Sequence, residues 1–475
     1  MKIVFVSGSF NVLHPGHLRL LRFAKECGNK LIVGVYSDNI AATAAHVHDH
    51  LRLEGLQSIS WVDEAFIIDE PVEEVIARLH PDIVVKGKEY ELRFNPELAV
   101  LEQYGGRLLF SSGETVFSSL DLIRKEFHDL DSRSIHLPQE YLARHGIEPS
   151  GMAELLKKFS QLTVCVVGDL IIDEYITCQP LGMSQEDPTI VVTPIDSTRF
   201  IGGAGIVAAH AAGLGASVHY LAVSGNDAAR DFALEELASA GVNVRLLVDE
   251  SRPTTLKQRY RCNGKSMLRV SHLHQGAISV TLQKQMLEEL ARAIDGADLL
   301  VFSDFNYGCL PQPLVEEMIA LAKSKGVMLA ADSQSSSQVG DISRFKGMDL
   351  LTPTEREARI STRNREDGLV ILAEQLRQQA TACNILLKLG EEGLLIHASN
   401  GKEKEWLTDR VDALNDSPKD VAGAGDSLLI TSALALASGG NIWEAASLGS
   451  LAAALQVGRV GNTPLQAEEL MKELL

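Results

Sequence analysis

The chain twice contains the same arrangement, and this arrangement constrains its fold most: a β-branched run, a glycine, and then a helical stretch. The first copy begins with KIVFVS and reaches Gly8, and the second begins with TVCVV and reaches Gly168. Between the first copy and about residue 127, strand-like runs alternate with helix-like segments, which requires crossover connections and is typical of parallel sheets. These runs lie at 31–37, 82–87 and 107–110.

A second, larger segment continues the alternation to the end of the sequence. Its strand candidates lie at 218–223, 299–303, 327–332, 350–352 and 385–390. Residues 131–160 are polar and contain Pro138, Pro149 and Gly151, so we expect a linker there with at most one short helix. The sequence therefore predicts an α/β protein with two doubly wound parallel-sheet domains, at 1–130 and 161–475.

Composition excludes several classes of partner. The 44 Lys and Arg against 63 Asp and Glu give a net charge of −19, which argues against a nucleic-acid-binding or anionic-membrane surface. No apolar run is long enough to span a bilayer, and the first residues do not resemble a secretion signal. Six widely spaced cysteines without a CxxC pair indicate free thiols. We expect a cytoplasmic protein.

The first candidate site follows the first strand, in the segment GSFNVLHPGH from Gly8 to His17. Pro15 suits the first position of a helix, and His14 and His17 are three residues apart, so both can face the start of that helix. A helix N-terminus attracts anions, and two imidazoles beside it could stabilise a phosphoryl group. The alternative is that the histidines are capping or surface residues.

This segment resembles the GxFDxxHxGH signature of the nucleotidylyltransferase superfamily, with Asn11 in place of the usual Asp. Ser37-Asp38, Arg52 and the segment Lys86–Tyr90 resemble later motifs of that superfamily, whose lysine after Ser-Asp is missing here. The resemblance implies that His14 and His17 are catalytic. It also implies nucleotide contacts by Gly8, Ser9, Phe10, Asn11, Lys86, Gly87, Ser118 and Ser119.

Three nearby histidines, at 46, 48 and 50, have two interpretations. They are either solvated surface residues or a replacement contact to phosphate or metal.

The second candidate site is the segment DVAGAGDS from Asp420 to Ser427, which precedes the apolar stretch LLITSALALA. Glycines at the start of a helix let the backbone approach a phosphate. The carboxylate that follows could accept a proton from an attacking hydroxyl. The alternative is an ordinary glycine turn in which Asp426 caps the helix.

This second segment resembles the DTxGAGD signature of ribokinase-like (PfkB) sugar kinases. Further similarities are Gly168-Asp169 with Asp173, the Gly202-Gly203 pair, Ser303-Asp304-Phe305, Asp332 and the loop at Gly390 and Gly393. The resemblance implies the following roles: Asp426 as base; Gly423, Ala424, Gly425, Gly390 and Gly393 at the nucleotide and its phosphates; Asp173, Gly202 and Gly203 at the sugar; Glu357 at magnesium.

Four departures from the kinase pattern leave the activity of this site open. Ile206, Thr354 and Ala422 stand where the family has Asn, Asn and Thr, and no lysine follows Asp332 at the family's position.

Together the two halves resemble the bifunctional heptose-phosphate kinase/adenylyltransferases of ADP-heptose synthesis, a route to lipopolysaccharide precursors, with the domain order reversed. The resemblance implies sugar phosphates and nucleoside triphosphates as partners, ATP and Mg²⁺ as cofactors, and a homodimer formed through strands at 176–200 and 254–271. Two alternatives remain. One is a transferase whose kinase domain serves only for binding or dimerisation, and the other is a CTP-using transferase acting on a polyol phosphate.

Overall fold

The computed structural model describes residues 2–475 except 11–12, 14, 42–46, 88–89, 91–94, 112–134, 185, 188, 263–264, 335–339 and 400–405. It divides into two compact units, residues 1–132 with 366–372 and residues 133–365 with 373–475. Among the described residues, no helix combines the length and the apolar character needed to cross a bilayer.

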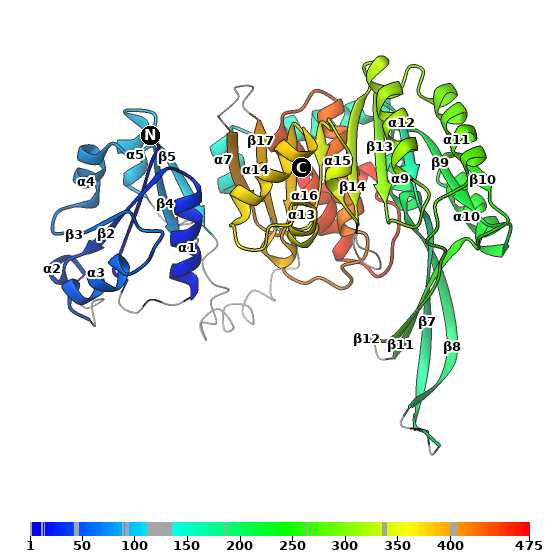
Figure 1. Cartoon of the computed structure of the whole chain (residues 1–475), viewed down its shortest axis with the longest axis horizontal. Coiled ribbons are helices and arrows are strands. Elements are labelled where there is room, and N and C mark those ends of the chain that lie inside the picture. Colours follow the sequence, from blue (N-terminus) through cyan, green and yellow to red (C-terminus); the bar gives the residue numbers. More distant parts are fainter. Residues whose placement is uncertain are drawn as a thin grey trace. The chain divides into compact units, whose positions relative to one another are not determined.

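The first unit contains a five-stranded, fully parallel sheet in the order β3-β2-β1-β4-β5 (Figure 1). Its strands are β1 (Ile3–Gly8), β2 (Lys30–Tyr36), β3 (Glu64–Ile68), β4 (Ile83–Gly87) and β5 (Arg107–Ser111). Its helices are α1 (Pro15–Glu26), α2 (Asp38–Ala41), α3 (Asp49–Gln57), α4 (Val72–Leu79) and α5 (Glu97–Glu102).

The order of these strands locates the ligand crevice of the first unit. β1 lies between β2 and β4, so the chain builds the sheet outward in one direction and then in the other. Ligands of such sheets bind at the carboxyl ends of the two strands where the order reverses. Those ends are Gly8 and Gly87, which places the first candidate motif and Lys86 at the same edge.

The second unit is built on a nine-stranded sheet in the order β10-β9-β6-β13-β14-β15-β16-β17-β18. These strands are β6 (Thr163–Gly168), β9 (Ser217–Ser224), β10 (Asn243–Val248), β13 (Leu299–Asp304), β14 (Met328–Ser333), β15 (Leu350–Leu351), β16 (Asn384–Lys388), β17 (Leu394–Ser399) and β18 (Trp406–Val411). The expected parallel pairing is confirmed from β10 to β16, whereas β17 and β18 are antiparallel additions at one edge.

Helices cover this sheet: α7 (Gln139–His145), α8 (Pro149–Lys157), α9 (Ala204–Gly213), α10 (Ala228–Ser239), α11 (Val280–Ala293), α12 (Gln312–Ser324), α13 (Glu355–Thr362), α14 (Leu369–Ala380), α15 (Ala424–Ala437), α16 (Ile442–Val457) and α17 (Ala467–Leu474). Short 3₁₀ turns are η3 (Lys158–Gln161), η4 (Ile342–Arg344) and η5 (Gly390–Glu392). α15 and α16 are buried over most of their length and pack closely. A Cβ added at Gly449 would lie 2.1 Å from Ser432 Oγ, so the small residue permits this approach.

Four further strands form a separate sheet, which we call the strand lid: β7 (Leu170–Met183), β8 (Ile190–Gly203), β11 (Thr255–Cys262) and β12 (Lys265–His272). It extends from the body of the second unit as a long, twisted ribbon (Figure 1). β7 and β8 are buried near the body and exposed at the far end, where Leu181 and Ile195 are 62% and 64% exposed. These strands occupy both segments expected to carry a lid, at 176–200 and 254–271.

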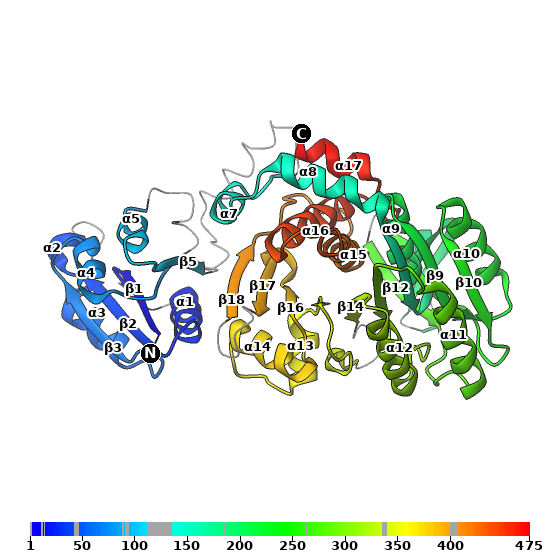
Figure 2. The ribbon, with the colours of Figure 1, turned by 90° about the horizontal axis from the view of Figure 1, so that it is seen from above.

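The segment at 135–161 differs from the expected linker. It forms α7, α8 and η3, and Tyr141, Met152 and Phe159 are buried in the main core of the second unit. α8 lies beside α17 (Figure 2). The polar composition of this segment predicts a linker, but its sparse apolar residues lie on one face of each helix and carry the packing.

Candidate functional site

The carboxyl ends of the central strands of the second unit bring together a buried ion pair. Lys388, at the end of β16, donates a hydrogen bond from Nζ to Asp332 Oδ2 of β14 at 2.8 Å. Burial raises the pKa of Asp332 to about 6 although Lys388 opposes this shift. Burial works against the charge of Lys388, but the carboxylates of Asp332 and then Glu357 raise its pKa. The lysine therefore remains a cation inside the site.

Asp426 lies in the first turn of α15 and is buried. Burial, followed by the neighbouring Asp332 carboxylate, raises the pKa of Asp426 to about 7. Gln334 donates a hydrogen bond from Nε2 to Asp426 Oδ1 at 3.3 Å. Gly423 caps the helix with φ +79°, a conformation that favours glycine. A carboxyl that titrates near neutrality therefore lies at a helix N-terminus, where N–H groups can receive an anion.

Gly425 keeps this helix start open toward Lys388. A Cβ at Gly425 would lie 3.2 Å from Lys388 Nζ. The bare backbone therefore lets the ammonium group approach the predicted anion hole formed by Gly423, Ala424 and Gly425.

The predicted sugar residues lie where the strand lid joins the body. Asp173 is on β7, and Gly202 and Gly203 end β8. A Cβ at Gly202 would lie 2.5 Å from Asp173 Oδ2, so only glycine permits this approach. Arg259 of β11 lies 3.4 Å from Asp173 Oδ1 through Nη2. Burial raises the pKa of Asp173, and Arg259 opposes this shift.

Beside Asp173 lies a pocket of about 280 Å³ that no sequence motif predicted. We call it the cationic pocket, because Arg259, Arg261, Arg269 and Lys419 line it together with Tyr175, Ser266, Pro418, Asp420 and Val421. The Tyr175 hydroxyl donates a hydrogen bond to Asp420 Oδ2 at 2.9 Å. The Arg259 and Arg261 guanidinium carbons lie 5.1 Å and 5.0 Å from the centre of the Tyr175 ring.

The sequence contains a pattern from which this pocket could have been predicted. Cations alternate at 257, 259 and 261 in the run KQRYR, and residues at this spacing share one face of a strand. Lys257 lies close enough to Asp173 and Asp426 to oppose the rise in pKa that burial causes in each carboxyl.

The predicted nucleotide loop follows β16. Gly390 and Gly393 have φ +64° and +89°, and a Cβ at Gly393 would lie 2.2 Å from the Val411 carbonyl oxygen. Glu357, the predicted magnesium ligand, caps α13: its Oε2 accepts a hydrogen bond from Thr354 N at 2.7 Å, and Thr354 Oγ1 accepts one from Glu357 N at 3.3 Å. Within the described parts of the chain, no group of three or more His, Cys, Asp or Glu side chains is arranged to hold a metal ion.

The site of the first unit begins where β1 ends. Phe10 is buried with φ +48°, and its ring centre lies 5.2 Å from that of His17, a half-buried residue on α1. A Cβ at Gly8 would lie 3.1 Å from the Phe10 ring, so the turn is tight. The predicted residues Asn11, His14, Ser118 and Ser119 lie outside the described residues.

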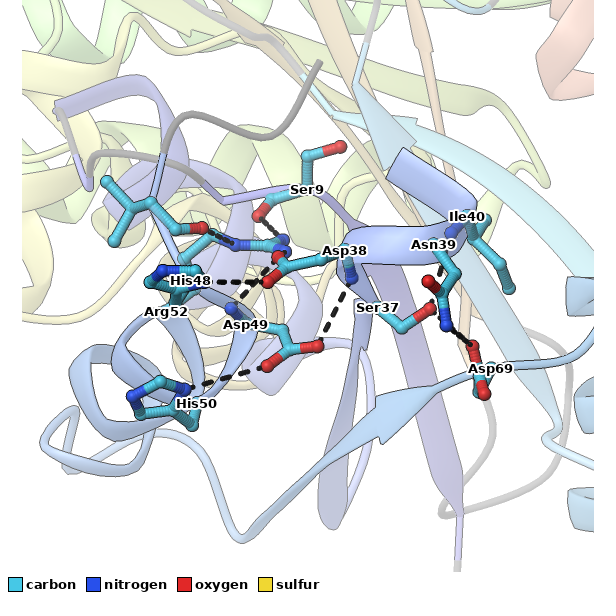
Figure 3. Close-up of polar contacts among 11 residues, drawn as sticks. Ser9, Ser37, Asp38, Asn39, Ile40, His48, Asp49, His50, Arg52 and Asp69 are labelled. Atoms are coloured by element: carbon cyan, nitrogen blue, oxygen red, sulfur yellow. Dashed lines mark hydrogen bonds and ion pairs between the residues drawn. The ribbon is translucent and has the colours of Figure 1, made fainter. Parts of the chain in front are cut away.

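Arg52 joins three segments of this site (Figure 3). Its side chain is fully buried and donates hydrogen bonds to the Ser9 and Val47 carbonyl oxygens at 2.5 Å and 2.6 Å. Its Nη2 also donates to Asp38 Oδ1 at 2.7 Å. Hydrogen bonds, first from His48 and then from Arg52, lower the pKa of Asp38. Arg52 thus fixes the turn after β1 to the Ser37-Asp38 motif.

Two other predicted features of the first unit contact acidic side chains. Lys86 Nζ donates a hydrogen bond to Glu97 Oε1 at 2.7 Å, and its ammonium lies 4.9 Å from the centre of the Tyr90 ring. His48 and His50 are exposed and lie near Asp38 and Asp49, with N–O distances of 3.0 Å and 3.7 Å (Figure 3). These contacts fit the solvated-surface interpretation of both histidines, and His46 lies outside the described residues.

Residues 161–468 match the family model of pfkB family carbohydrate kinases. The chain belongs to this family. Residues 5–124 match a second model, described as cytidylyltransferase-like. The predicted combination of a kinase-family domain and a nucleotidylyltransferase-like domain, in this order, is therefore confirmed, and we call these the kinase domain and the transferase domain.

Curated relatives share the name "Bifunctional protein HldE". The chain is 33% identical over 320 residues to the protein from Desulfatibacillum aliphaticivorans, which covers 66% of this chain and 64% of that protein. It is 32% identical over 313 residues to the protein from Helicobacter hepaticus, covering 65% and 63% of the two chains. The chain thus spans a little under two thirds of the length of these relatives.

Solved structures with a similar fold are sugar kinases. Phosphofructokinase-2 from Escherichia coli, in complex with substrates and products, matches with a TM-score of 0.54 and 18% identity, covering 66% of this chain and 98% of that chain. Ribokinase from Arabidopsis thaliana, complexed with ribose and ATP, matches with a TM-score of 0.51 and 18% identity, covering 66% and 98%. At this identity the similarity establishes the fold.

Proposed function

We propose that the chain is a bifunctional enzyme of nucleotide-sugar synthesis. The kinase domain transfers a phosphoryl group from ATP to a sugar phosphate of the heptose 7-phosphate class. The transferase domain transfers a nucleotidyl group from ATP to a sugar 1-phosphate, giving a product of the ADP-heptose class and pyrophosphate. The observation that carries the proposal is the cationic pocket beside Asp173, since a sugar kinase needs such a pocket only when its sugar already carries a phosphate.

In the kinase domain, Asp426 accepts the proton of the attacking sugar hydroxyl. The hydroxyl oxygen forms a bond to the γ-phosphorus of ATP, and the bond from that phosphorus to ADP breaks. N–H groups at the start of α15, with Lys388, stabilise the transferred group. Asp173 orients the sugar by accepting hydrogen bonds from its hydroxyls.

The existing phosphate of the sugar is assigned to the cationic pocket. Arg259, Arg261 and Arg269 can each present paired N–H groups to phosphate oxygens, a geometry that lysine lacks.

Magnesium would supply positive charge that neutralises the nucleotide phosphates. Asp332 is the described residue that fits it, because its Oδ1 is buried and has no hydrogen-bond partner among the described residues. Glu357 is less suited, because its carboxylate caps α13.

In the transferase domain, a sugar 1-phosphate oxygen attacks the α-phosphorus of the nucleotide and pyrophosphate leaves. His14 and His17 stabilise the charge that develops, and Ser118 and Ser119 hold the triphosphate. Gly8, Ser9, Phe10 and Asn11 are the residues we assign to nucleotide contact. No covalent intermediate is needed, because positioning and charge stabilisation account for the transfer.

The kinase proposal is tested by measuring ADP release from ATP with candidate sugar phosphates, comparing the native chain with Asp426→Asn. Loss of the general base should reduce turnover by about 10² to 10⁴-fold. Turnover that does not depend on Asp426 would support the alternative in which the kinase domain only binds or dimerises.

The transferase proposal is tested by pyrophosphate release with ATP and with CTP, using His17→Ala as the inactive control. ATP should be the better donor. Higher activity with CTP and a polyol phosphate would overturn the choice of nucleotide.

We also propose that the chain acts as a cytoplasmic homodimer assembled through the strand lid. Leu181, Met183, Ile190 and Ile195 give the far end of the lid an exposed apolar surface, and all six cysteines are free thiols. Light scattering should give about twice the chain mass of 51.6 kDa. Leu181→Glu combined with Ile195→Glu should give the monomer mass, and an unchanged mass would exclude the lid as the interface.

A further inference from the structure

A cluster of arginines lies on α13 and just after it in the kinase domain. Arg356 and Arg359 are three residues apart on α13, which places them on the same side of the helix. Arg363 caps the end of the helix with φ +55°, and Arg365 follows it. Together with Lys388 and Gly390, these arginines line a pocket of about 1030 Å³. We call it the α13 pocket.

The cluster has more positive charge than its protein neighbours neutralise. Arg359 pairs with Glu355 at 2.7 Å. Arg356, Arg363 and Arg365 are exposed, and none has an ion pair or hydrogen bond with a residue that the structure describes. Three guanidinium groups therefore remain available beside one pocket, and they are best suited to an anion with several negative oxygens.

The α13 pocket continues into the centre of the kinase site. Lys388 lines it and also contacts Asp332 at 2.8 Å. The same ammonium lies 3.2 Å from the position of a Cβ on Gly425, in the first turn of α15. An anion that extends from the arginines past Lys388 would reach the helix start where Asp426 lies. The volume of the pocket is in the range of sites for nucleotide-sized ligands.

Both acidic side chains of α13 already have protein partners, so neither is free to bind a metal ion. Glu357 is the acidic residue that remains of the kinase magnesium motif, and it accepts the N–H of Thr354 at 2.7 Å as a helix cap. Other cations must then balance part of the charge of a nucleotide bound here, and Arg356, Arg363 and Arg365 line the same pocket.

We propose that Arg356, Arg363 and Arg365 bind the polyphosphate chain of the nucleoside triphosphate consumed by the kinase domain. They supply positive charge where the magnesium motif of this chain is incomplete. This inference rests on the proposed kinase function but concerns nucleotide binding, so it is tested without sugar turnover.

The test measures ATP-dependent protection from hydrogen exchange in the full chain, using peptides that cover residues 352–365 and 385–397. Localised protection reports binding at the kinase domain even when the transferase domain also binds ATP. The variant is Arg356→Ala, Arg363→Ala and Arg365→Ala together. The matched control replaces Arg245, Arg292 and Lys325, three cations of the same unit that pair with acidic residues elsewhere.

The ATP concentration for half-maximal protection should rise about tenfold or more in the triple variant and stay unchanged in the control, since bonds between charged groups contribute this much. Replacing the arginines by lysines should give an intermediate value, because lysine keeps the charge but loses the paired N–H geometry. Any protection by adenosine, which has no phosphates, should be the same in all variants. A thermal midpoint close to that of the native chain confirms that each variant is folded.

A midpoint for ATP within twofold of the native value would overturn the inference. Arginine-dependent protection by inorganic pyrophosphate with an unchanged ATP midpoint would also overturn it, because the arginines would then bind a different anion. If ATP protection depends on the arginines but no sugar phosphate is phosphorylated, the inference stands and the proposed kinase function fails.

Discussion

Asp169, Asp332 and Asp426 are buried carboxyl groups near the carboxyl edge of the nine-stranded sheet, and burial raises the pKa of each. Asp169, with a pKa of about 6, accepts hydrogen bonds from the N–H groups of Phe305, Tyr307 and Cys309 and so fixes that loop. Asp332, also about 6, pairs with Lys388. Asp426, about 7, accepts a long hydrogen bond from Gln334. Of these three carboxyl groups, Asp426 makes the weakest contact with other residues, so it is the one that can act as a base.

The pKa of Asp426 predicts the pH dependence of the kinase reaction. The base must be ionised to accept a proton, so turnover at saturating substrate should rise with pH and level off above about 7. The measurement is kcat for ADP release between pH 5 and 9, at constant ionic strength. An ascending limb centred near the ordinary carboxyl pKa of about 4 would contradict the role of Asp426.

The same shift predicts a stability effect for Asp426→Asn. In the unfolded chain the carboxyl titrates near about 4, so between that pH and about 7 the folded state binds the extra proton and stability falls as pH rises. Asparagine mimics the neutral carboxyl group, so the variant does not lose stability as the pH rises through this range. The thermal midpoint of the variant should therefore exceed that of the native chain at pH 8, and the difference should shrink toward pH 5.

A thermal midpoint of Asp426→Asn that is lower than the native value at pH 8 would mean that the charged carboxylate makes stabilising contacts. Asp231→Asn is a control, because that residue lies in the first turn of another helix, α10.

The sequence predicted those site residues that lie next to a glycine turn. Asp426 and Gly423 follow a strand-to-helix motif, and the structure describes them at the start of α15. Lys388 and the cationic pocket were missed, because their partners come from distant parts of the chain. The Lys388–Asp332 pair joins residues 56 positions apart, and no local pattern encodes such a contact.

At the element scale, the junction of the strand lid with the body depends on close approach between β7 and β8. Gly202 pairs with Ile171, so the backbone of β8 passes directly over the side chain of Asp173. Gly203 then turns with φ +60° into α9. The strand pair thereby sets the position of the carboxylate assigned to the sugar.

Gly202→Ala should weaken sugar binding more than turnover. The new Cβ would lie 2.5 Å from Asp173 Oδ2, so the carboxylate must move. Loss of a hydrogen bond to a charged group corresponds to a rise in KM for the sugar phosphate of about tenfold or more. Gly151→Ala is the control, since nothing lies within 4 Å of a Cβ at that position. An unchanged KM would argue against a sugar contact by Asp173.

The first unit contains a comparable connection between elements, made by a single side chain. Arg52, on α3, contacts the turn after β1, the start of α2 and the residue before His48. Arg52→Ala leaves two carbonyl groups and Asp38 without these donors, so it should destabilise the first unit by about 2 kcal/mol or more. It should also reduce pyrophosphate release, because the Ser9 turn loses its support.

Arg78→Ala provides the matched control for Arg52→Ala, because Arg78 forms an exposed ion pair with Glu70 in the same unit. Exposed pairs contribute little, so the control should change the thermal midpoint only slightly. Equal effects of the two substitutions, measured by thermal unfolding and by pyrophosphate release, would exclude a special role for Arg52.

The alternation of strand and helix predicted most of the two main sheets, because buried parallel strands are continuous apolar runs. The outer half of the lid has no such signal: in β8, residues 190–199 are largely exposed, and their pairing with β7 determines their conformation. For α7 and α8 the sequence predicted one short helix at most, since their few apolar residues pack against a core formed much later in the chain. In both the outer lid and the helices α7 and α8, tertiary contacts determine the secondary structure.

At the scale of the whole molecule, each candidate site is built from described residues of one unit. The transferase residues Gly8, Phe10, His17 and Arg52 all belong to the unit that contains residues 1–132, and the kinase residues belong to the other. Each unit also has its own sheet and its own strand-order reversal. Domain order along the chain can therefore change without altering the chemistry of either site.

This separation predicts that the two activities fail independently. Asp426→Asn should reduce ADP release by about 10² to 10⁴-fold and leave pyrophosphate release at the native rate, whereas His17→Ala should do the reverse. Both rates are measured on the same full-length preparations, each at saturating substrate. A substitution that lowers both rates in a folded variant would show that the sites are coupled. In an equimolar mixture of the two variants, each rate should be half the native rate per chain, because half of the chains carry each intact site.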